Sequence, residues 1–221
     1  EVCRRRRAHL YRLGEAFRIR RHADGTFTYD GFQSRLPRLQ SALRGRHQQT
    51  NAALAVGVAE TLRDREGVPI SDTAIRQGLR KVRWEGRLEI LRERPCVLVD
   101  GAHNPAGVAA LVRSLRTDFS YETLILVLGV LKDKDYLQMV RRTAPLKARI
   151  LATRPGSERG LPAEVLAAAA RRHHASVEVV DKPREALQRA LDIAGPDDLV
   201  CIAGSLYLVA EIKELYRSRP R

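Results

Sequence analysis

The fold is indicated by residues 96–105, Cys96-Val97-Leu98-Val99-Asp100-Gly101-Ala102-His103-Asn104-Pro105, in which an apolar run enters a polar, glycine-containing turn. An uninterrupted apolar run of this kind is typical of a strand buried on both faces of a sheet. The pattern after the turn predicts a helix from Pro105 to Arg116. The segment therefore predicts a strand, a polar loop and a helix in succession.

The same alternation continues to the end of the chain. Further strands are expected at residues 124–128, 148–152, 177–180 and 199–202, and further helices at 134–142, 162–174, 183–193 and 206–216. Strands that alternate with helices through short loops predict an α/β fold with a doubly wound, mostly parallel sheet. Ligands bind such sheets at the carboxyl ends of the strands. Four loops lie there: residues 100–105, 129–135, 153–159 and 203–205.

The first part of the chain follows a different pattern. Residues 15–30 alternate around Asp24-Gly25 and predict a hairpin, and a polar stretch follows it. Apolar residues at helical spacing predict a helix over 49–65, and Ser71-Asp72 caps a second helix over 73–79, in which Ala74 and Ile75 are expected to face a neighbour. The pattern changes near residues 83–87.

Composition narrows the possible functions. The 221 residues are 44% hydrophobic and 30% charged, and no apolar run is long enough for a membrane span. The net charge is +14, but only 5% of residues are aromatic and no nucleic-acid motif is present, which argues against nucleic acid as a partner. Three widely spaced cysteines predict free thiols in a reducing cytoplasm. The chain begins at Glu1 without Met, so residue 1 is not expected to be a natural start.

Three motifs occur in a fixed order. They are Gly45-Arg46-His47-Gln48-Gln49-Thr50-Asn51-Ala52-Ala53-Leu54-Ala55, then Trp84-Glu85-Gly86-Arg87-Leu88-Glu89, then Asp100-Gly101-Ala102-His103-Asn104-Pro105. Weaker matches are Gly129-Val130-Leu131-Lys132-Asp133-Lys134-Asp135 and Gly204-Ser205-Leu206-Tyr207. Together they resemble the folylpolyglutamate synthase family, which includes the bifunctional bacterial dihydrofolate synthases, within the Mur ligase superfamily.

This resemblance implies a Rossmann-like C-terminal domain over 86–221. Residues 1–85 then correspond to a hairpin-and-helix piece of the central ATPase domain, because the family's Gly-Lys-Ser phosphate loop and its magnesium ligands have no match here. The implied activity is a cytoplasmic, ATP-dependent ligation of L-glutamate to a folate or dihydropteroate carboxylate through an acyl phosphate. ATP would act with Mg²⁺ held by the missing part, and the segment alone is expected to be inactive. The complete protein is expected to be a monomer.

The resemblance also suggests nucleotide-binding residues. Asn51 corresponds to a position that contacts adenine, and His47 either lines the same pocket or is a packed or capping histidine. Arg87 resembles the arginine that reaches the γ-phosphate, although Glu85 stands where the family commonly has proline. Asp100 resembles the acceptor for the ribose hydroxyls.

The remaining candidates concern the amino acid. His103 resembles a residue of the active-site cleft that binds nucleotide or glutamate, and with Arg87 it is our catalytic candidate. Ser205 and Tyr207 stand where the family forms part of its glutamate pocket, although Tyr207 could equally be a ring packed on the last helix. Lys132 and Arg159 are candidate partners for a carboxylate. His173 and His174 are expected to be charges at a helix C-terminus rather than ligands.

Two other functions remain open at this point. One is another Mur-type amide ligase that acts on a cell-wall or other amino-acid-bearing substrate. The other is a non-catalytic module that binds a nucleotide or another ligand and derives from a split gene. Either would keep the α/β fold, because the fold alone does not fix the reaction.

Overall fold

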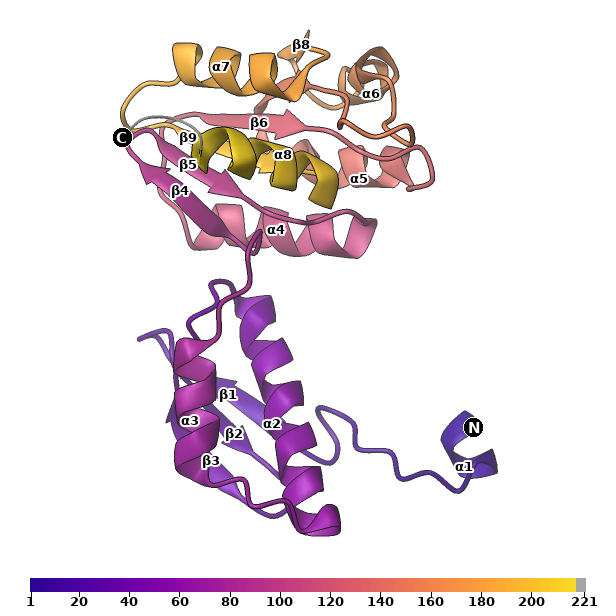
Figure 1. The fold of residues 1–221 in the computed structure, drawn as a ribbon, viewed down its shortest axis with the longest axis vertical. Helices are drawn as coiled ribbons and strands as arrows, with labels where there is room; N and C mark the ends of the chain where they lie inside the picture. Colours follow the sequence, from indigo (N-terminus) through magenta and orange to yellow (C-terminus); the bar gives the residue numbers. More distant parts are fainter. Residues whose placement is uncertain (218–221) are drawn as a thin grey trace. The chain divides into compact units, whose positions relative to one another are not determined.

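The computed structural model describes residues 1–217, and the chain divides into two compact units, Glu1–Trp84 and Glu85–Arg221 (Figure 1). We call them unit 1 and unit 2 and describe each by itself. No helix among residues 1–217 is both long and apolar enough to cross a membrane.

Unit 1 is built on a three-stranded antiparallel sheet in the order β1-β2-β3. Its elements are α1 (Val2–Arg5), β1 (Arg18–Arg21), β2 (Phe27–Asp30), β3 (Arg35–Leu39), α2 (Arg46–Glu66) and α3 (Asp72–Lys81). Strands β1 and β2 form the predicted hairpin, whose turn is closed by the Thr26 backbone N–H donating to Asp24 Oδ1. The predicted cap of α3 is confirmed, because Ser71 Oγ accepts the Ala74 backbone N–H.

Unit 1 also departs from the sequence prediction in two places. The polar stretch after the hairpin forms strand β3, whose Leu36 and Leu39 are buried while its arginines are exposed. Ala74 was expected to pack beside Ile75, but only Ile75 is buried. The core of the unit comes mainly from β2, β3 and α2, and Ile75 of α3 and Phe17 complete it.

Unit 2 contains a six-stranded sheet in the order β4-β5-β9-β6-β7-β8. Its strands are β4 (Glu89–Glu93), β5 (Cys96–Val99), β6 (Leu124–Leu128), β7 (Arg149–Ala152), β8 (Val177–Val179) and β9 (Leu199–Ala203). Its helices are α4 (Pro105–Thr117), α5 (Tyr136–Thr143), the 3₁₀ turn η1 (Ala144–Leu146), α6 (Ala163–Ala170), α7 (Pro183–Ile193) and α8 (Leu206–Arg217). Five strands are parallel and β4 is antiparallel to β5, so the expected doubly wound, mostly parallel α/β fold is confirmed.

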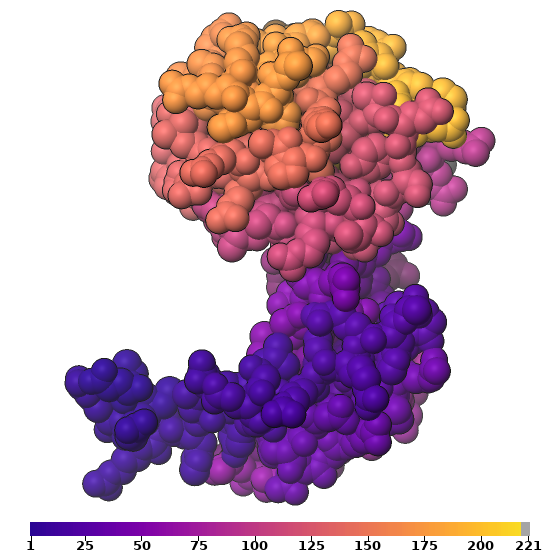
Figure 2. Space-filling model, turned by 180° about the vertical axis from the view of Figure 1, so that it is seen from behind, coloured from indigo at the N-terminus to yellow at the C-terminus, as the bar shows by residue number. Residues whose placement is uncertain are grey.

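The central strands of unit 2 are covered on both faces. Leu126 and Leu128 of β6 pack in one cluster with apolar residues of α4, α5 and α6. Ile125 and Val127, which point to the opposite face, pack in a second cluster with α7 and α8. Residues 160–195, which include α6 and α7, form the orange part of the surface in Figure 2. The two-sided cover explains why these strands are uninterrupted apolar runs.

Two features of unit 2 differ from the prediction. The antiparallel edge strand β4 was not expected, because its residues are only partly buried and do not form an apolar run. His174 was expected to be a charge at a helix end, but the residue is buried and its Nε2 lies 2.9 Å from Thr143 Oγ1. Burial lowers the pKa of the His174 imidazole, because it disfavours the charged form.

Candidate functional site

The four loops expected at the carboxyl ends of the strands lie along one edge of the sheet in unit 2. The Asp100 backbone N–H donates to Ile202 O at 3.0 Å, and the Gly204 N–H donates to Ala102 O at 3.0 Å. These bonds join the loops after β5 and β9. The Gly129 N–H donates to Ala203 O, which brings in the loop after β6. The edge is therefore a continuous surface built by separate parts of the sequence.

Gly204 is required where these loops meet. Its φ of +108° lies in a region that side chains rarely adopt, and a Cβ there would lie 2.6 Å from Gly129 O. The next residue, Ser205, is buried, and its Oγ accepts the Tyr207 backbone N–H at 3.1 Å at the start of α8. The turn between β9 and α8 is thus fixed by close backbone approach and by a serine hydrogen bond.

Asp100 follows β5 directly and is 6% exposed. Its Oδ1 accepts the Ala102 backbone N–H at 2.9 Å, and its Oδ2 accepts the Leu88 backbone N–H at 3.0 Å. These two bonds, one to each carboxylate oxygen, fix the orientation of the group. Asp100 is therefore a positioned carboxylate that links the strand-end loop to the segment that carries Arg87.

His103 lies in the same loop, and its Nδ1 is 2.7 Å from Gly101 O. A carbonyl oxygen can only accept, so this contact requires a hydrogen on Nδ1. In the neutral ring Nε2 then carries no hydrogen and acts as an acceptor. Asn104 completes the loop, because its Oδ1 accepts the Gly107 N–H at 2.8 Å and caps α4.

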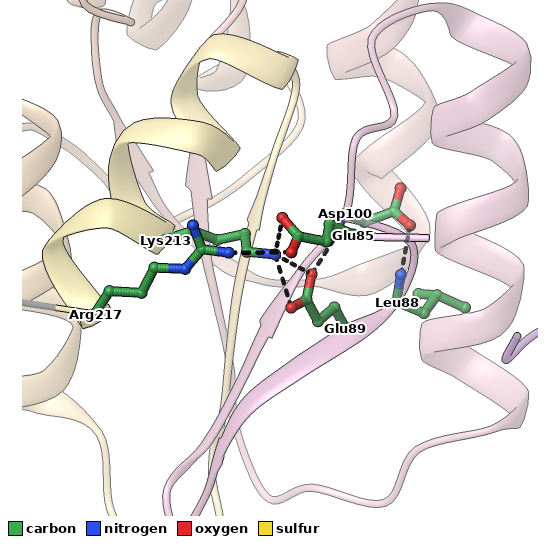
Figure 3. Close-up of polar contacts among 7 residues, drawn as sticks. Glu85, Leu88, Glu89, Asp100, Lys213 and Arg217 are labelled. Atoms are coloured by element: carbon green, nitrogen blue, oxygen red, sulfur yellow. Dashed lines mark hydrogen bonds and ion pairs between the residues drawn. The ribbon is translucent and has the colours of Figure 1, made fainter. Parts of the chain in front are cut away.

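Arg87 is exposed and stands between two buried residues, Gly86 and Leu88. Both neighbours have positive φ, +68° for Gly86 and +44° for Leu88. The Gly86 carbonyl accepts the Gly101 N–H at 2.7 Å. The Leu88 N–H donates to Asp100, and Figure 3 shows this second bond. The backbone on each side of Arg87 is thus bonded to the strand-end loop.

Lys132 and Arg159 belong to two loops that bond to each other. The Lys132 backbone N–H donates to Arg159 O at 2.8 Å, and Lys132 Nζ donates to Glu158 O at 3.1 Å. Arg159 forms an ion pair with Asp133 at 2.6 Å. Hydrogen bonds from Lys134 and Arg159 lower the pKa of Asp133 to about 2. Arg159 therefore already has a carboxylate partner within the protein.

Tyr207 lies at the start of α8 and is 51% exposed. The pKa of Arg159 is raised mainly by Asp133, and Tyr207 contributes, which places the phenol near the loop after β7. Ser205 and Tyr207 are thus joined by a hydrogen bond at the start of α8, and the Tyr207 phenol acts electrostatically on Arg159.

His47 and Asn51 lie in the first turns of α2 in unit 1. Asn51 Nδ2 donates to Gln48 Oε1 at 3.0 Å, and Gln48 Nε2 lies 3.0 Å from His47 Nε2. Gly45 precedes the helix with φ of +97° and provides no side-chain cap. The three polar side chains form a connected group at the helix N-terminus, and Asn51 itself is exposed.

One cluster was not predicted from the sequence. Lys213 of α8 binds Glu85 and Glu89, and Arg217 binds Glu85 as well, as Figure 3 shows. The sequence did contain a pattern that indicates a buried lysine. Lys213 follows the buried Val209 by four residues and therefore lies on the same inward face of the helix. A lysine at an inward position requires a partner.

The comparisons with known proteins agree with this architecture. The family described as "Mur ligase, glutamate ligase domain" matches residues 86–206, and the chain belongs to this family. Within it, the chain is 35% identical over 189 residues to folylpolyglutamate synthase of Lacticaseibacillus casei, which covers 85% of this chain and 42% of that protein. It is 34% identical to dihydrofolate synthase/folylpolyglutamate synthase of Bacillus subtilis, over 80% of this chain and 40% of that protein.

A solved structure shows the same likeness. Mycobacterium tuberculosis folylpolyglutamate synthase complexed with ADP has a TM-score of 0.88 and 28% identity, covering 99% of this chain and 52% of that chain. The chain thus resembles the folylpolyglutamate and dihydrofolate synthases and spans less than half the length of the two curated relatives above. The resemblance drawn from the sequence motifs is confirmed.

Proposed function

We propose that this chain supplies the glutamate-ligase domain, and part of the nucleotide site, of an ATP-dependent ligase that joins L-glutamate to the carboxylate of a folate or dihydropteroate. The observation that carries the proposal is the Asp100–Asn104 loop, with its positioned carboxylate and oriented histidine at the carboxyl edge of a parallel sheet. The family match over residues 86–206 supports the same reaction class.

In this reaction the carboxylate attacks the γ-phosphate of ATP to give an acyl phosphate, and the glutamate amine then displaces phosphate. The proposed nucleotide ligands are Asp100 for the ribose hydroxyls, Arg87 for the γ-phosphate, and Asn51 with His47 for adenine. Arginine suits the γ-phosphate because its planar fork stays charged and bonds two oxygens.

The amino-acid side of the proposal uses the other loops. Nε2 of His103 would accept a hydrogen bond from the incoming ammonium or amine, since Nδ1 is committed to Gly101 O. Ser205 and Tyr207, with Lys132 and Arg159, would face the glutamate carboxylates. Arg159 forms an ion pair with Asp133, so Arg159 would have to exchange the Asp133 carboxylate for a carboxylate of glutamate in order to bind the substrate.

Mg²⁺ would accompany the ATP phosphates and neutralise charge as the γ-phosphate transfers. Among residues 1–217 there is no group of three or more His, Cys, Asp or Glu side chains that could hold a metal ion. The donor set of the described residues therefore does not fit a Mg²⁺ cage, and we assign no step of the reaction to the ion in this part of the protein. We further propose a cytoplasmic protein that is a monomer when complete.

The test is glutamate-dependent release of ADP, with ATP, Mg²⁺ and either dihydropteroate or tetrahydrofolate. It is run on this chain alone and on the chain joined to the sequence encoded directly upstream. We expect activity in the joined form, loss of at least about 100-fold for Arg87→Ala, and little change for Arg92→Ala, an exposed arginine on β4.

Absence of ADP release with both pterin substrates would overturn the proposal. Release with a UDP-N-acetylmuramyl peptide acceptor instead would favour a cell-wall ligase. That arm is included because the chain is also 30% identical to UDP-N-acetylmuramyl-tripeptide synthetase of Lactobacillus delbrueckii, over 70% of this chain and 30% of that protein.

A further inference from the structure

The segment Glu85–Glu89 holds an unusual backbone that needs support. Leu88 adopts φ of +44°, a left-handed conformation that is unfavourable for a non-glycine residue. The backbone of Gly86, two residues earlier, also has a positive φ. Between them lies Arg87, whose side chain is exposed while both neighbours are buried. What fixes this short stretch therefore sets the backbone from which the Arg87 side chain projects.

Part of the support comes from hydrogen bonds inside the stretch and to the strand-end loop. Glu89 Oε2 accepts the Gly86 N–H at 2.6 Å, so this carboxylate closes the turn around Arg87. Gly86 O and the Leu88 N–H bond to Gly101 and Asp100. The turn is thus held on one side by the loop and on the other by the Glu89 carboxylate.

Lys213 fixes that carboxylate. Its Nζ lies 2.8 Å from both oxygens of Glu89 and 2.9 Å from Glu85 Oε2 (Figure 3). An ammonium has three N–H donors, and here three carboxylate oxygens surround it. The Lys213 side chain is only 9% exposed and that of Glu89 is 29% exposed, so solvent screens this pair less than an ordinary surface pair, whereas Glu85 is largely exposed. Lys213 therefore joins the two ends of the Arg87 turn.

The position of Lys213 on its helix indicates that the charge matters. Val209 and Ile212, on the same part of α8, are buried apolar residues. For stability alone an apolar side chain would serve about as well as a buried ion pair, because desolvation offsets much of the attraction. The Lys213 ammonium differs from an apolar side chain because its hydrogen bonds fix the positions of the Glu85 and Glu89 carboxylates at the two ends of the turn.

We propose that Lys213 is a positioning residue, which holds Glu85 and Glu89 so that the intervening Arg87 is presented toward the γ-phosphate. The identity of the ligand, a γ-phosphate, rests on the proposed function. The claim that Lys213 holds the turn rests only on contacts within unit 2. In this role Lys213 acts through the carboxylates of Glu85 and Glu89. Arg217, which pairs with Glu85 at 3.0 Å and is exposed, adds a weaker contact to one end only.

The first measurement is hydrogen exchange of the peptide spanning residues 84–90 in the 221-residue chain. Lys213→Met removes the charge and keeps an unbranched apolar stem, and it leaves two carboxylates facing each other. We expect exchange about tenfold faster in this peptide, with the central strands unchanged. Lys213→Arg should restore slow exchange, and adding Glu85→Gln to Lys213→Met should restore it in part, because one of the repelling charges is gone.

The second measurement compares two nucleotides in the form of the protein that has ligase activity. Lys213→Met should weaken binding of AMPPCP, which has a γ-phosphonate, about tenfold, and binding of ADP less than about twofold. The matched control is Lys182→Met, which removes an exposed pair with Glu185 on α7 and should change neither affinity. A role in stability alone would weaken both nucleotides equally.

The inference is overturned if Lys213→Met exchanges like the wild type, or if AMPPCP and ADP lose affinity to the same extent. A wild-type protein without ligase activity refutes the proposed function instead, and the exchange of residues 84–90 then still decides whether Lys213 holds the turn. The two failures are therefore distinguishable.

Discussion

Unit 1 and unit 2 each bury charged groups, but they place them differently. The residues that the structure describes include three buried Asp, Glu or Lys residues: Glu60 in unit 1, and Asp100 and Lys213 in unit 2. Glu60 accepts four hydrogen bonds, from the Tyr29 hydroxyl at 2.6 Å, the Ser34 hydroxyl at 2.8 Å and the backbone N–H groups of Phe32 and Gln33. Its acceptor capacity is used entirely by its own unit.

The buried charges of unit 2 lie at the margin of the sheet and not in its interior. Asp100 follows the end of β5, and Lys213 connects α8 with the segment just before β4. The interior of this unit is apolar on both faces of the sheet. The difference teaches that the small three-stranded unit depends on a buried carboxylate to fix its loop, while the large unit is stabilised by packing and can use its polar groups for ligands.

The largest expected effect tests the role of packing in unit 2. Leu126→Ala removes a fully buried side chain from the central strand β6, and we expect a loss of about 3–5 kcal/mol in the free energy of unfolding. Hydrogen exchange along the chain, measured against denaturant, would locate the loss in residues 85–217. Leu137→Ala, at a residue 52% exposed, is the control and should cost less than about 0.5 kcal/mol. Equal losses of unfolding free energy for Leu126→Ala and Leu137→Ala would contradict the view that packing of the central strands stabilises unit 2.

The second effect tests the role of Glu60 in unit 1. Glu60→Ala leaves the Tyr29 hydroxyl, the Ser34 hydroxyl and two backbone N–H groups without their acceptor, and we expect a loss of about 2–3 kcal/mol in unit 1. Glu66→Ala, at an exposed position of the same helix, is the matched control. Exchange of residues 27–36 should rise with the first change only. If residues 27–36 of Glu60→Ala exchange as slowly as in the wild type, packing and not the Glu60 carboxylate fixes the loop.

A smaller, pH-dependent effect sharpens the same contrast. Burial raises the pKa of Glu60, but hydrogen bonds from Tyr29, Ser34 and the loop N–H groups outweigh it, so the pKa lies below its usual value of 4.5. A lowered pKa in the folded state adds stability that is full above the unfolded pKa and is lost as the pH falls through the folded pKa. Unit 1 should therefore begin to lose stability as the pH falls below about 5, and should lose more as the pH falls through the lowered pKa of Glu60.

The measurement is denaturant unfolding of wild type and Glu60→Gln across these pH values. Glu60→Gln should be less stable at pH 7 and should show a flatter dependence on pH, because the titrating group is gone. Parallel pH profiles for the two proteins would contradict the assignment of this dependence to Glu60.

Much of this architecture was predictable from local sequence, and the exceptions have physical causes. Residues 96–99 and 124–128 form strands with the predicted bounds, because strands buried on both faces are continuous apolar runs. Strands β3 and β4 were missed because each lies at a sheet edge and is only partly buried. A strand with one core face and interruptions such as Pro37 gives a weak pattern.

The candidate site was likewise predictable only in part. The strand-end loops could be located because parallel strands align their carboxyl ends, and the Asp100 loop follows a clear strand. The Lys213 cluster could not, because it joins residues 124 positions apart, and pairing across such a separation depends on how α8 packs on the sheet. Local patterns indicate that a lysine faces inward but not which carboxylate it meets.

The smallest expected effect compares two carboxylates of one loop at the sheet edge. Asp135 Oδ1 accepts the Gln138 N–H at 3.1 Å and caps α5, whereas Asp133 forms exposed ion pairs with Lys134 and Arg159. Asp135→Ala should cost about 1 kcal/mol, because it removes a helix cap. Asp133→Ala should leave unfolding unchanged at pH 7, since exposed pairs contribute little to stability. Denaturant unfolding of both variants, with exchange of residues 129–143, checks the order. A larger loss for Asp133→Ala would mean that the pair with Arg159 holds the edge together, and the polar margin of unit 2 would then be structural in the way that Glu60 is in unit 1.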